Sequence, residues 1–323
     1  MKRYYATLAF LTCSVLLAML WAATPLTAQT KVTLRASGGP TGTGKDLRIQ
    51  MVAEAVRRGN PDWTVDTING PTTVAEITMM ARGQLNFTTI DAASMPSIAR
   101  GSYGGIKLPK PVHLRWLLPS TAMTNVLYMT ANMSINSYAD IKNKKLPIKF
   151  SMGRKGTDPY NIITKVLKAY GFSPEDIIKW GGKRQNAGSD RAAQLIADGL
   201  LEVFIHAGVY PAVPITELER TRKIKAVFIR EPDIQAKLKA EKFIKVPIAA
   251  GSYTFVKEKT STMAMPTMVA VLAEMPGDIA YNFTRAVWEQ REKFLYPLHK
   301  IFRTYLHPDV VSSWAAEYRD LLH

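Results

Sequence analysis

Cysteine is nearly absent from this sequence, since Cys13 is the single one among 323 residues. It lies inside an apolar run near the amino terminus and follows Thr12, whereas a lipoprotein site has Gly, Ala or Ser before a cysteine that ends such a run. A chain with one cysteine forms no internal disulfide, and beyond residue 28 it has neither a thiolate nucleophile nor a cysteine ligand for a metal. The sequence therefore excludes disulfide scaffolds and cysteine enzymes, and it argues against a lipid anchor.

Other catalytic patterns are missing as well. No serine lies in the Gly-x-Ser-x-Gly turn of serine hydrolases. The histidines lack the spacing of metal ligands: His113, His206, His299, His307 and His323. We expect His299 in a helix and His307 in the turn before Pro308, while His206 ends a predicted strand and either lines a cleft or is paired locally. Nothing in these patterns indicates an enzyme, a metal site or a cofactor.

Long apolar runs are confined to the amino terminus. Lys2 and Arg3 precede a mostly apolar stretch over residues 8–23, and the small-residue site Leu26-Thr27-Ala28 follows it. This order is typical of a secretory signal peptide over residues 1–28, with cleavage after Ala28. A retained membrane anchor is the alternative, but the stretch is short for a span and no later segment approaches about 18 apolar residues.

Acidic residues are few relative to basic ones, at 26 against 42, which gives a net charge of +16. Loss of Lys2 and Arg3 with the leader leaves about +14, a sign that favours anionic partners. The basic residues are spread along the chain and no nucleic-acid motif is present, so we expect no nucleic-acid partner.

Short β-rich runs alternate with helix-period segments from Lys31 onward, which is typical of α/β folds with parallel sheets. The pattern occurs twice. Strands are expected over residues 32–36, 63–68, 85–90, 147–152 and 201–206, and helices over residues 46–57, 74–82, 158–170 and 191–198. Two further β-compatible stretches, residues 113–129 and 261–272, are suited to connect two lobes, and aromatic-rich amphipathic helices are expected over residues 278–294 and 296–323.

The segment from Gly39 to Asp46 follows a strand, opens a helix and fits the phosphate-loop pattern up to its last position. That position needs a hydroxyl for magnesium, whereas Asp46 supplies a carboxylate, so a nucleotide-hydrolysing enzyme is disfavoured. A plain tight turn remains the alternative. Glycines and free N–H groups at a helix start attract an anion, and residues 153–157 offer a second such loop with Arg154 and Lys155.

The order of these motifs resembles the periplasmic solute-binding receptors of TRAP transporters, specifically the TAXI group. The resemblance rests on residues 34–44, 70–73, 82–87, 153–157, 198–211, 250–253 and 278–281. The chain departs from the group at Lys45-Asp46-Leu47, where a tyrosine pair is usual, and at Val74-Ala75-Glu76. The resemblance implies a two-lobed type II binding-protein fold, in which each lobe is a mostly parallel sheet flanked by helices and the ligand cleft lies between the lobes.

The expected organisation is a signal peptide (1–28), lobe I (29–123 and 250–323) and lobe II (124–249). The expected function is capture of a small organic anion in the periplasm, namely a dicarboxylate, an acidic amino acid such as glutamate, or a keto acid. The protein then delivers it, as a monomer and without catalysis, to a TRAP-type permease. An exported enzyme on the same scaffold and a basic surface-interaction protein are the alternatives.

The candidate ligand-binding residues fall into three groups. Lobe I supplies backbone and hydroxyl donors from Ser37, Gly38, Gly39, Thr41, Gly42, Thr43, Gly70, Thr72 and Thr73. Lobe II supplies Arg154, Lys155, Gly156 and Thr157, which hold the anion. Selectivity is assigned to Thr88, Asp91, Gly208 and Tyr253, although Asp91 is equally suited to cap the next segment.

Overall fold

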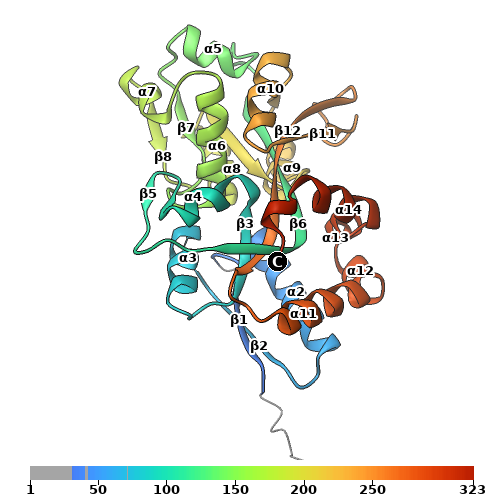
Figure 1. Ribbon diagram of the computed structural model, residues 1–323. Coiled ribbons are helices and arrows are strands. Elements are labelled where there is room, and N and C mark those ends of the chain that lie inside the picture. Colours follow the sequence, from blue (N-terminus) through green and yellow to red (C-terminus); the bar gives the residue numbers. More distant parts are fainter. Residues whose placement is uncertain (1–30, 41–42, 71) are drawn as a thin grey trace, which may run out of the picture. The chain divides into compact units, whose positions relative to one another are not determined.

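The computed structural model describes residues 31–40, 43–70 and 72–323 (Figure 1). The expected signal peptide and the candidate residues Thr41 and Gly42 lie outside the described residues. Residues 33–323 form one compact unit, which contains all the helices and strands described below. In the described part of the chain, no helix is long and apolar enough to cross a membrane.

Ten of the strands among the described residues form one sheet, in the order β2-β1-β3-β12-β6-β9-β7-β8, with β10 on β6 and β11 on β12. A two-stranded ribbon, β4 and β5, is separate. The bounds are β1 (Thr33–Ser37), β2 (Thr64–Ile68), β3 (Phe87–Asp91), β4 (Ser102–Tyr103), β5 (Ile106–Lys107), β6 (Leu114–Thr130), β7 (Lys149–Ser151), β8 (Lys183–Gln185), β9 (Val203–Gly208), β10 (Ile224–Phe228), β11 (Ile244–Ile248) and β12 (Thr260–Leu272).

Helices connect and flank the strands (Figure 1). They are α2 (Gly44–Gly59), α3 (Thr73–Ala81), α4 (Met95–Ala99), α5 (Tyr138–Asn143), α6 (Asp158–Ala169), α7 (Pro174–Lys179), α8 (Ser189–Ala197), α9 (Val213–Thr221), α10 (Pro232–Ala240), α11 (Gly277–Gln290), α12 (Tyr296–Leu298), α13 (Lys300–Tyr305) and α14 (Pro308–Glu317). Short turns of other helix types cover Ala92–Ser94, Arg291–Leu295 and Arg319–Leu321.

Parallel strands occur in two groups. β1 pairs in parallel with β2 and β3, and we call these three strands the first half-sheet. β7 pairs in parallel with β8 and β9, which we call the second half-sheet. In both groups a strand leads through a loop into a helix, as the alternating pattern predicts. The expected α/β fold, with parallel strands flanked by helices, is confirmed.

Two long antiparallel strands, β6 and β12, connect the half-sheets. β12 pairs with β3 of the first half-sheet, β6 pairs with β9 of the second, and the two strands pair with each other along most of β12. The prediction of long strands over residues 113–129 and 261–272 is confirmed. The β6–β12 register shifts twice near Pro266, and both strands carry a proline there, Pro119 and Pro266. Since proline lacks an N–H donor, the ladder is weakened at this point.

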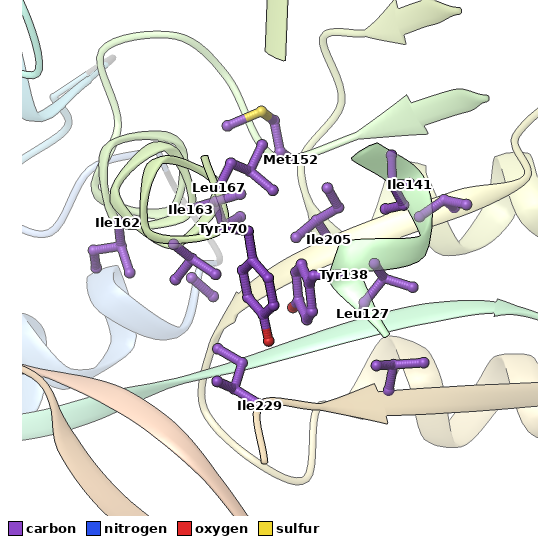
Figure 2. Close-up of a cluster of buried hydrophobic side chains, with 14 of the residues drawn as sticks. Leu127, Tyr138, Ile141, Met152, Ile162, Ile163, Leu167, Tyr170, Ile205 and Ile229 are labelled. Carbon is purple, nitrogen blue, oxygen red and sulfur yellow. The ribbon is translucent and has the colours of Figure 1, made fainter. Parts of the chain in front are cut away.

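Buried apolar side chains form separate clusters on the two half-sheets. The cluster on the second half-sheet contains the stacked rings of Tyr138 and Tyr170, whose centroids are 5.1 Å apart, and Figure 2 shows them between Leu127 of β6 and helix α6. Another cluster lies over the first half-sheet and includes Trp116 of β6. Because β6 contributes to both, this one strand links the two cores.

The carboxy-terminal region differs from the two long helices expected. After α11 the chain makes a π-helical turn and then three short helices. His299, expected within a helix, has extended backbone angles and caps α13 by accepting a hydrogen bond from the Ile301 N–H. His307 lies in a bend before Pro308, as predicted, and its side chain also caps α14. Side-chain caps at both histidines therefore break the expected helix into pieces.

Substitution of Thr262 in β12 tests how much its side-chain hydrogen bonds to β6 and to the residue after β10 stabilise the fold. Its buried hydroxyl donates to the Asn125 carbonyl at 2.8 Å and accepts from the Ile229 N–H at 3.1 Å. Thr262→Val leaves these buried groups without that partner, so we expect a loss of about 1 to 3 kcal/mol in the free energy of unfolding, measured with urea. Thr260→Val at the start of the same strand is the control, with an expected change within about 0.5 kcal/mol. Equal effects of the two substitutions would contradict this role.

Candidate functional site

The candidate site lies where strands of the two half-sheets end and helices begin. Ser37 ends β1 and Asp91 ends β3, while α2 and α3 begin in the loops beyond the first half-sheet. Thr43 and Thr72 cap these helices, since their hydroxyls accept hydrogen bonds from the Asp46 and Ala75 N–H groups. Helix α6 begins at Asp158 in the loop after β7. The carboxyl ends of parallel strands are where ligands bind in open α/β sheets.

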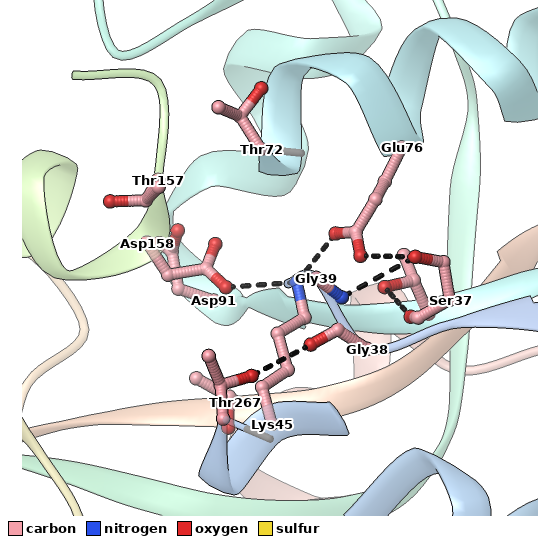
Figure 3. Close-up of polar contacts among 12 residues, drawn as sticks. Ser37, Gly38, Gly39, Lys45, Thr72, Glu76, Asp91, Thr157, Asp158 and Thr267 are labelled. Carbon is pink, nitrogen blue, oxygen red and sulfur yellow. Dashed lines mark hydrogen bonds and ion pairs between the residues drawn. The ribbon is translucent and has the colours of Figure 1, made fainter. Parts of the chain in front are cut away.

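Lys45 in the first turn of α2 joins elements of both half-sheets. Its Nζ lies 2.6 Å from Oε2 of Glu76 on α3 and 3.1 Å from Oδ2 of Asp158 on α6. Figure 3 shows the ammonium between these two carboxylates. One ammonium is thus shared by two buried carboxylates, and the pair Lys45–Asp158 connects α2 to α6.

Glu76 is held from the opposite side by the end of β1. Its Oε1 accepts a hydrogen bond of 2.9 Å from the Ser37 hydroxyl, and the Ser37 hydroxyl in turn accepts from the Gly39 N–H at 3.3 Å. A Cβ on Gly70 would lie 2.6 Å from Ser37 Oγ and 2.8 Å from Glu76 Cγ. Glycine at position 70 therefore lets the turn before α3 approach this pair closely.

The start of α6 makes further polar contacts with the first half-sheet. Asp158 Oδ1 accepts a 2.5 Å hydrogen bond from the Tyr103 hydroxyl, and Gly156 accepts one from the Val74 N–H at 3.2 Å. Asn161 donates to Ser94 at 2.7 Å and, more weakly, to Asp91 Oδ2 at 3.3 Å. This contact between α6 and the first half-sheet is polar and buried. We call Ser37, Lys45, Glu76, Asp91, Tyr103, Asp158 and Asn161 the polar cluster.

Burial and charge pull the pKa values of the polar cluster in opposite directions. Burial lowers the pKa of Lys45, but the charges of Asp158 and Glu76 outweigh it, so the pKa lies above its ordinary value. Burial, together with the charge of Asp158, raises the pKa of Glu76 above its ordinary value although the Lys45 ammonium lowers it. Burial and the charge of Asp158 raise the pKa of Asp91 to about 6, and Asp91 Oδ1 has no hydrogen-bond partner. Asp91 is therefore the least compensated carboxylate in the cluster.

The structure brings many of the expected ligand-binding residues to this region. Those in or directly beside the polar cluster are Ser37, Gly38, Gly39, Thr43, Gly70, Thr72, Thr73, Thr88, Asp91, Gly156 and Thr157. Arg154 and Lys155 precede Gly156 in the same loop, but their side chains are exposed to solvent. The loop that was expected to hold an anion thus supplies a backbone contact to α3 in this structure.

Gly208 and Tyr253 belong to another region. Tyr253 lies in an aromatic cluster with Tyr128 and Phe255, and its hydroxyl accepts from the Ala212 N–H. A Cβ on Gly208 would lie 2.6 Å from the His206 ring. His206 is buried beside this cluster, and burial lowers its pKa to about 4, so it is neutral at physiological pH.

Sequence reasoning missed Lys45, Glu76, Tyr103 and Asn161 as site residues and placed Asp158 only at the start of an expected helix. Lys45 carried a signal, because it stands where the resembled group has a tyrosine. Glu76 carried a weaker signal, because it is a charged residue next to Ile77 on the face of a short helix that becomes buried. Tyr103 and Asn161 had none, since their partners lie 55 and 67 residues away.

The cluster is tightly packed and is not a metal site by composition. Among the described residues, no group of three His, Cys, Asp or Glu side chains is arranged to hold a metal ion. A cavity of about 490 Å³ lies elsewhere, between α10, β11 and α14, with Phe243, Trp314 and Tyr318 in its wall. We base the site on the polar cluster because the cavity contains no comparable buried charge.

Lys45→Met tests whether the ammonium holds the polar cluster together. Removal of the shared cation leaves two buried carboxylates uncompensated, so we expect the free energy of unfolding at pH 7 to fall by about 3 to 5 kcal/mol, measured with urea. Lys237→Met, which removes an exposed lysine 3.8 Å from Asp233, is the matched control, with an expected change below about 1 kcal/mol. A loss no larger than that of the control would contradict the bridging role.

Asp91→Asn tests the uncompensated carboxyl. An unfolded Asp titrates near 3.9, whereas native Asp91 titrates at about 6, so the native state binds more protons between these values. The free energy of unfolding therefore falls as pH rises through this window, by up to about 3 kcal/mol. We expect Asp91→Asn to remove that fall and to be more stable than wild type above pH 6, in urea unfolding at pH 4 to 8. Asp66→Asn, at an exposed position of β2, is the control, and a difference between Asp91→Asn and wild type that does not vary with pH would refute the assignment.

Several solved structures of other proteins have a fold similar to that of this chain. PhnD1 from Prochlorococcus marinus (MIT 9301), solved in complex with methylphosphonate, is similar with a TM-score of 0.55 and 12% identity, over 84% of this chain and 90% of that chain. The periplasmic binding protein BugD has a TM-score of 0.52 and 13% identity, over 89% and 93% of the two chains. XAC2383 from Xanthomonas citri, bound to ATP, has a TM-score of 0.51 and 12% identity, over 90% and 99%.

These likenesses show a shared fold of the periplasmic-binding-protein type. The sequence itself gives a more specific result, because the model of the NMT1-like family matches residues 44–313, from the first residue of α2 into α14. The matched range contains Lys45, Glu76 and Asp158, which are the residues of the two ion pairs that share the Lys45 ammonium. By this match over most of its length, the chain belongs to the NMT1-like family.

Proposed function

We propose that this protein is an exported solute-binding receptor that captures a small organic anion and delivers it to a TRAP-type membrane permease. The observation that carries the proposal is the buried polar contact between α6 and the first half-sheet, above all the Lys45–Asp158 pair. Buried charged groups at the ends of two half-sheets are a costly arrangement for stability alone. Such groups are suited to a ligand-binding cleft, in which they contact each other without ligand and contact the ligand once it has bound.

In this proposal the two half-sheets belong to two lobes, residues 29–123 with 250–323 and residues 124–249. The long strands β6 and β12 are the hinge, because they are shared by both and their ladder is weakened near Pro266. Ligand contacts to both lobes stabilise the closed state relative to the open one. The permease then recognises the closed surface, and no reaction is catalysed.

The charges near the site narrow the class of ligand. Arg48 is a buried cation of α2 and Lys45 is a partly buried one, whereas Glu76, Asp91 and Asp158 are buried acids. A dicarboxylate would add two negative charges to a site that already has three acids. An acidic amino acid also brings an ammonium group, and a monocarboxylic keto acid brings only one negative charge. These two classes therefore fit best. The hydroxyl and backbone groups of residues 37–43 and 70–73 remain the proposed donors to the ligand.

The proposal predicts a ligand-dependent gain in thermal stability. We expect the unfolding midpoint to rise by several degrees with one class among L-glutamate, 2-oxoglutarate, succinate and other short acids, since a ligand at about 100 times its Kd adds roughly 2.7 kcal/mol. Ethylammonium and nucleotides are the negative controls. NMR of the mixture checks that the acid is not consumed.

Other outcomes would point to other functions. Turnover of the acid would indicate an enzyme on this scaffold. No response to any small molecule by the folded protein, together with a salt-sensitive macromolecular partner, would indicate a surface-interaction protein. Either result would refute the receptor function.

A further inference from the structure

Arg48 is a buried cation that has no carboxylate partner in the described part of the chain. It lies on α2 one turn after Lys45, and only 7% of its surface is exposed. Its Nε has no hydrogen-bond partner, and among the described residues it forms no ion pair within 4.0 Å. Lys45, by contrast, contacts two carboxylates. The charge of Lys45 is therefore balanced by neighbouring carboxylates, whereas the charge of Arg48 is not.

An uncompensated guanidinium in this place is expensive. Burial lowers the pKa of Arg48 to about 10, and the nearby charge of Asp158 offsets only part of that effect. The side chain still carries its charge at neutral pH. Since a buried charge normally has a partner, its absence here points to a partner that is not part of the chain.

The position of the guanidinium indicates what that partner is. Arg48 Nη1 lies 3.4 Å from where a Cβ on Gly44 would be, next to the first residue of α2. The first turn of a helix carries a partial positive charge and free N–H groups. The titratable groups facing Arg48 from other elements are Asp158 of α6, Tyr305 of α13 and His299. The start of α2 thus places the Arg48 guanidinium beside helix N–H groups and the polar cluster, and the same turn carries the buried carboxylate of Asp46.

We propose that Arg48 is the residue that binds the carboxylate of the ligand, with the first turn of α2 completing the site. The planar guanidinium offers two parallel N–H donors to a carboxylate. Separation of the lobes moves Asp158 and α6 away from α2 and gives the ligand access. This inference rests on the proposed receptor function and deepens it, because it moves the anion-binding role from the exposed Arg154 to Arg48.

The test combines stability without ligand and affinity with ligand. Arg48→Met removes an uncompensated charge, so we expect the thermal midpoint without added acid to be equal to or above that of wild type. The same variant should bind the acid selected from L-glutamate, 2-oxoglutarate and succinate about 30-fold more weakly or worse, by calorimetry. A purely structural arginine would show the opposite combination, a lower midpoint and unchanged affinity.

Two further variants separate the possible outcomes. Arg48→Lys keeps the charge without the paired donors, and we expect at least a tenfold loss of affinity; it also serves if Arg48→Met does not fold. Arg154→Gln should bind as wild type does. Unchanged affinity in both Arg48 variants, or a loss in Arg154→Gln alone, would overturn the assignment while leaving the receptor function intact. If the folded wild type binds neither these three acids nor any other short acid, the proposed function fails, and the role of Arg48 fails with it.

Discussion

The shared ammonium of Lys45 is the interaction on which the rest of the site depends. Glu76 and Asp158 come from helices on different half-sheets, and without a cation between them their charges would repel in a buried setting. The cation also fixes where α6 starts relative to the first half-sheet, and the contacts of Tyr103, Asn161 and Gly156 follow from that placement. One side chain in the first turn of α2 thus orders a buried polar contact that is formed by several elements.

The sequence predicted the fold more completely than the site. Parallel strands, the helices that follow them and the long strands β6 and β12 are local patterns of apolar periodicity, and they were recognised as such. Strand ends with glycine and threonine were also recognised, which located Ser37, Thr43 and Thr72. The ion pairs were not predicted, because Lys45 and Asp158 are 113 residues apart and no pattern of neighbouring residues indicates that they meet. The sequence also does not show that Arg154 is exposed and Arg48 buried, because the burial of a side chain depends on tertiary packing.

The family match and the geometry address different questions. Membership of the NMT1-like family covers residues 44–313, and the fold is shared with binding proteins of about 12 to 13% identity. Neither specifies a ligand, because the same fold holds different molecules by changing the groups at its strand ends. In this chain those groups are a compensated lysine, an uncompensated arginine and an uncompensated aspartate, a combination suited to a ligand that carries charge.

Strand β6 affects how the protein unfolds, because it belongs to both cores. Its 17 residues contribute Leu127 to the core of the second half-sheet and Trp116 to that of the first. A strand that is shared in this way cannot leave one core without disturbing the other, so the half-sheets are expected to unfold together as one cooperative unit. A small molecule that bound to either half-sheet would then protect both of them from proteolysis.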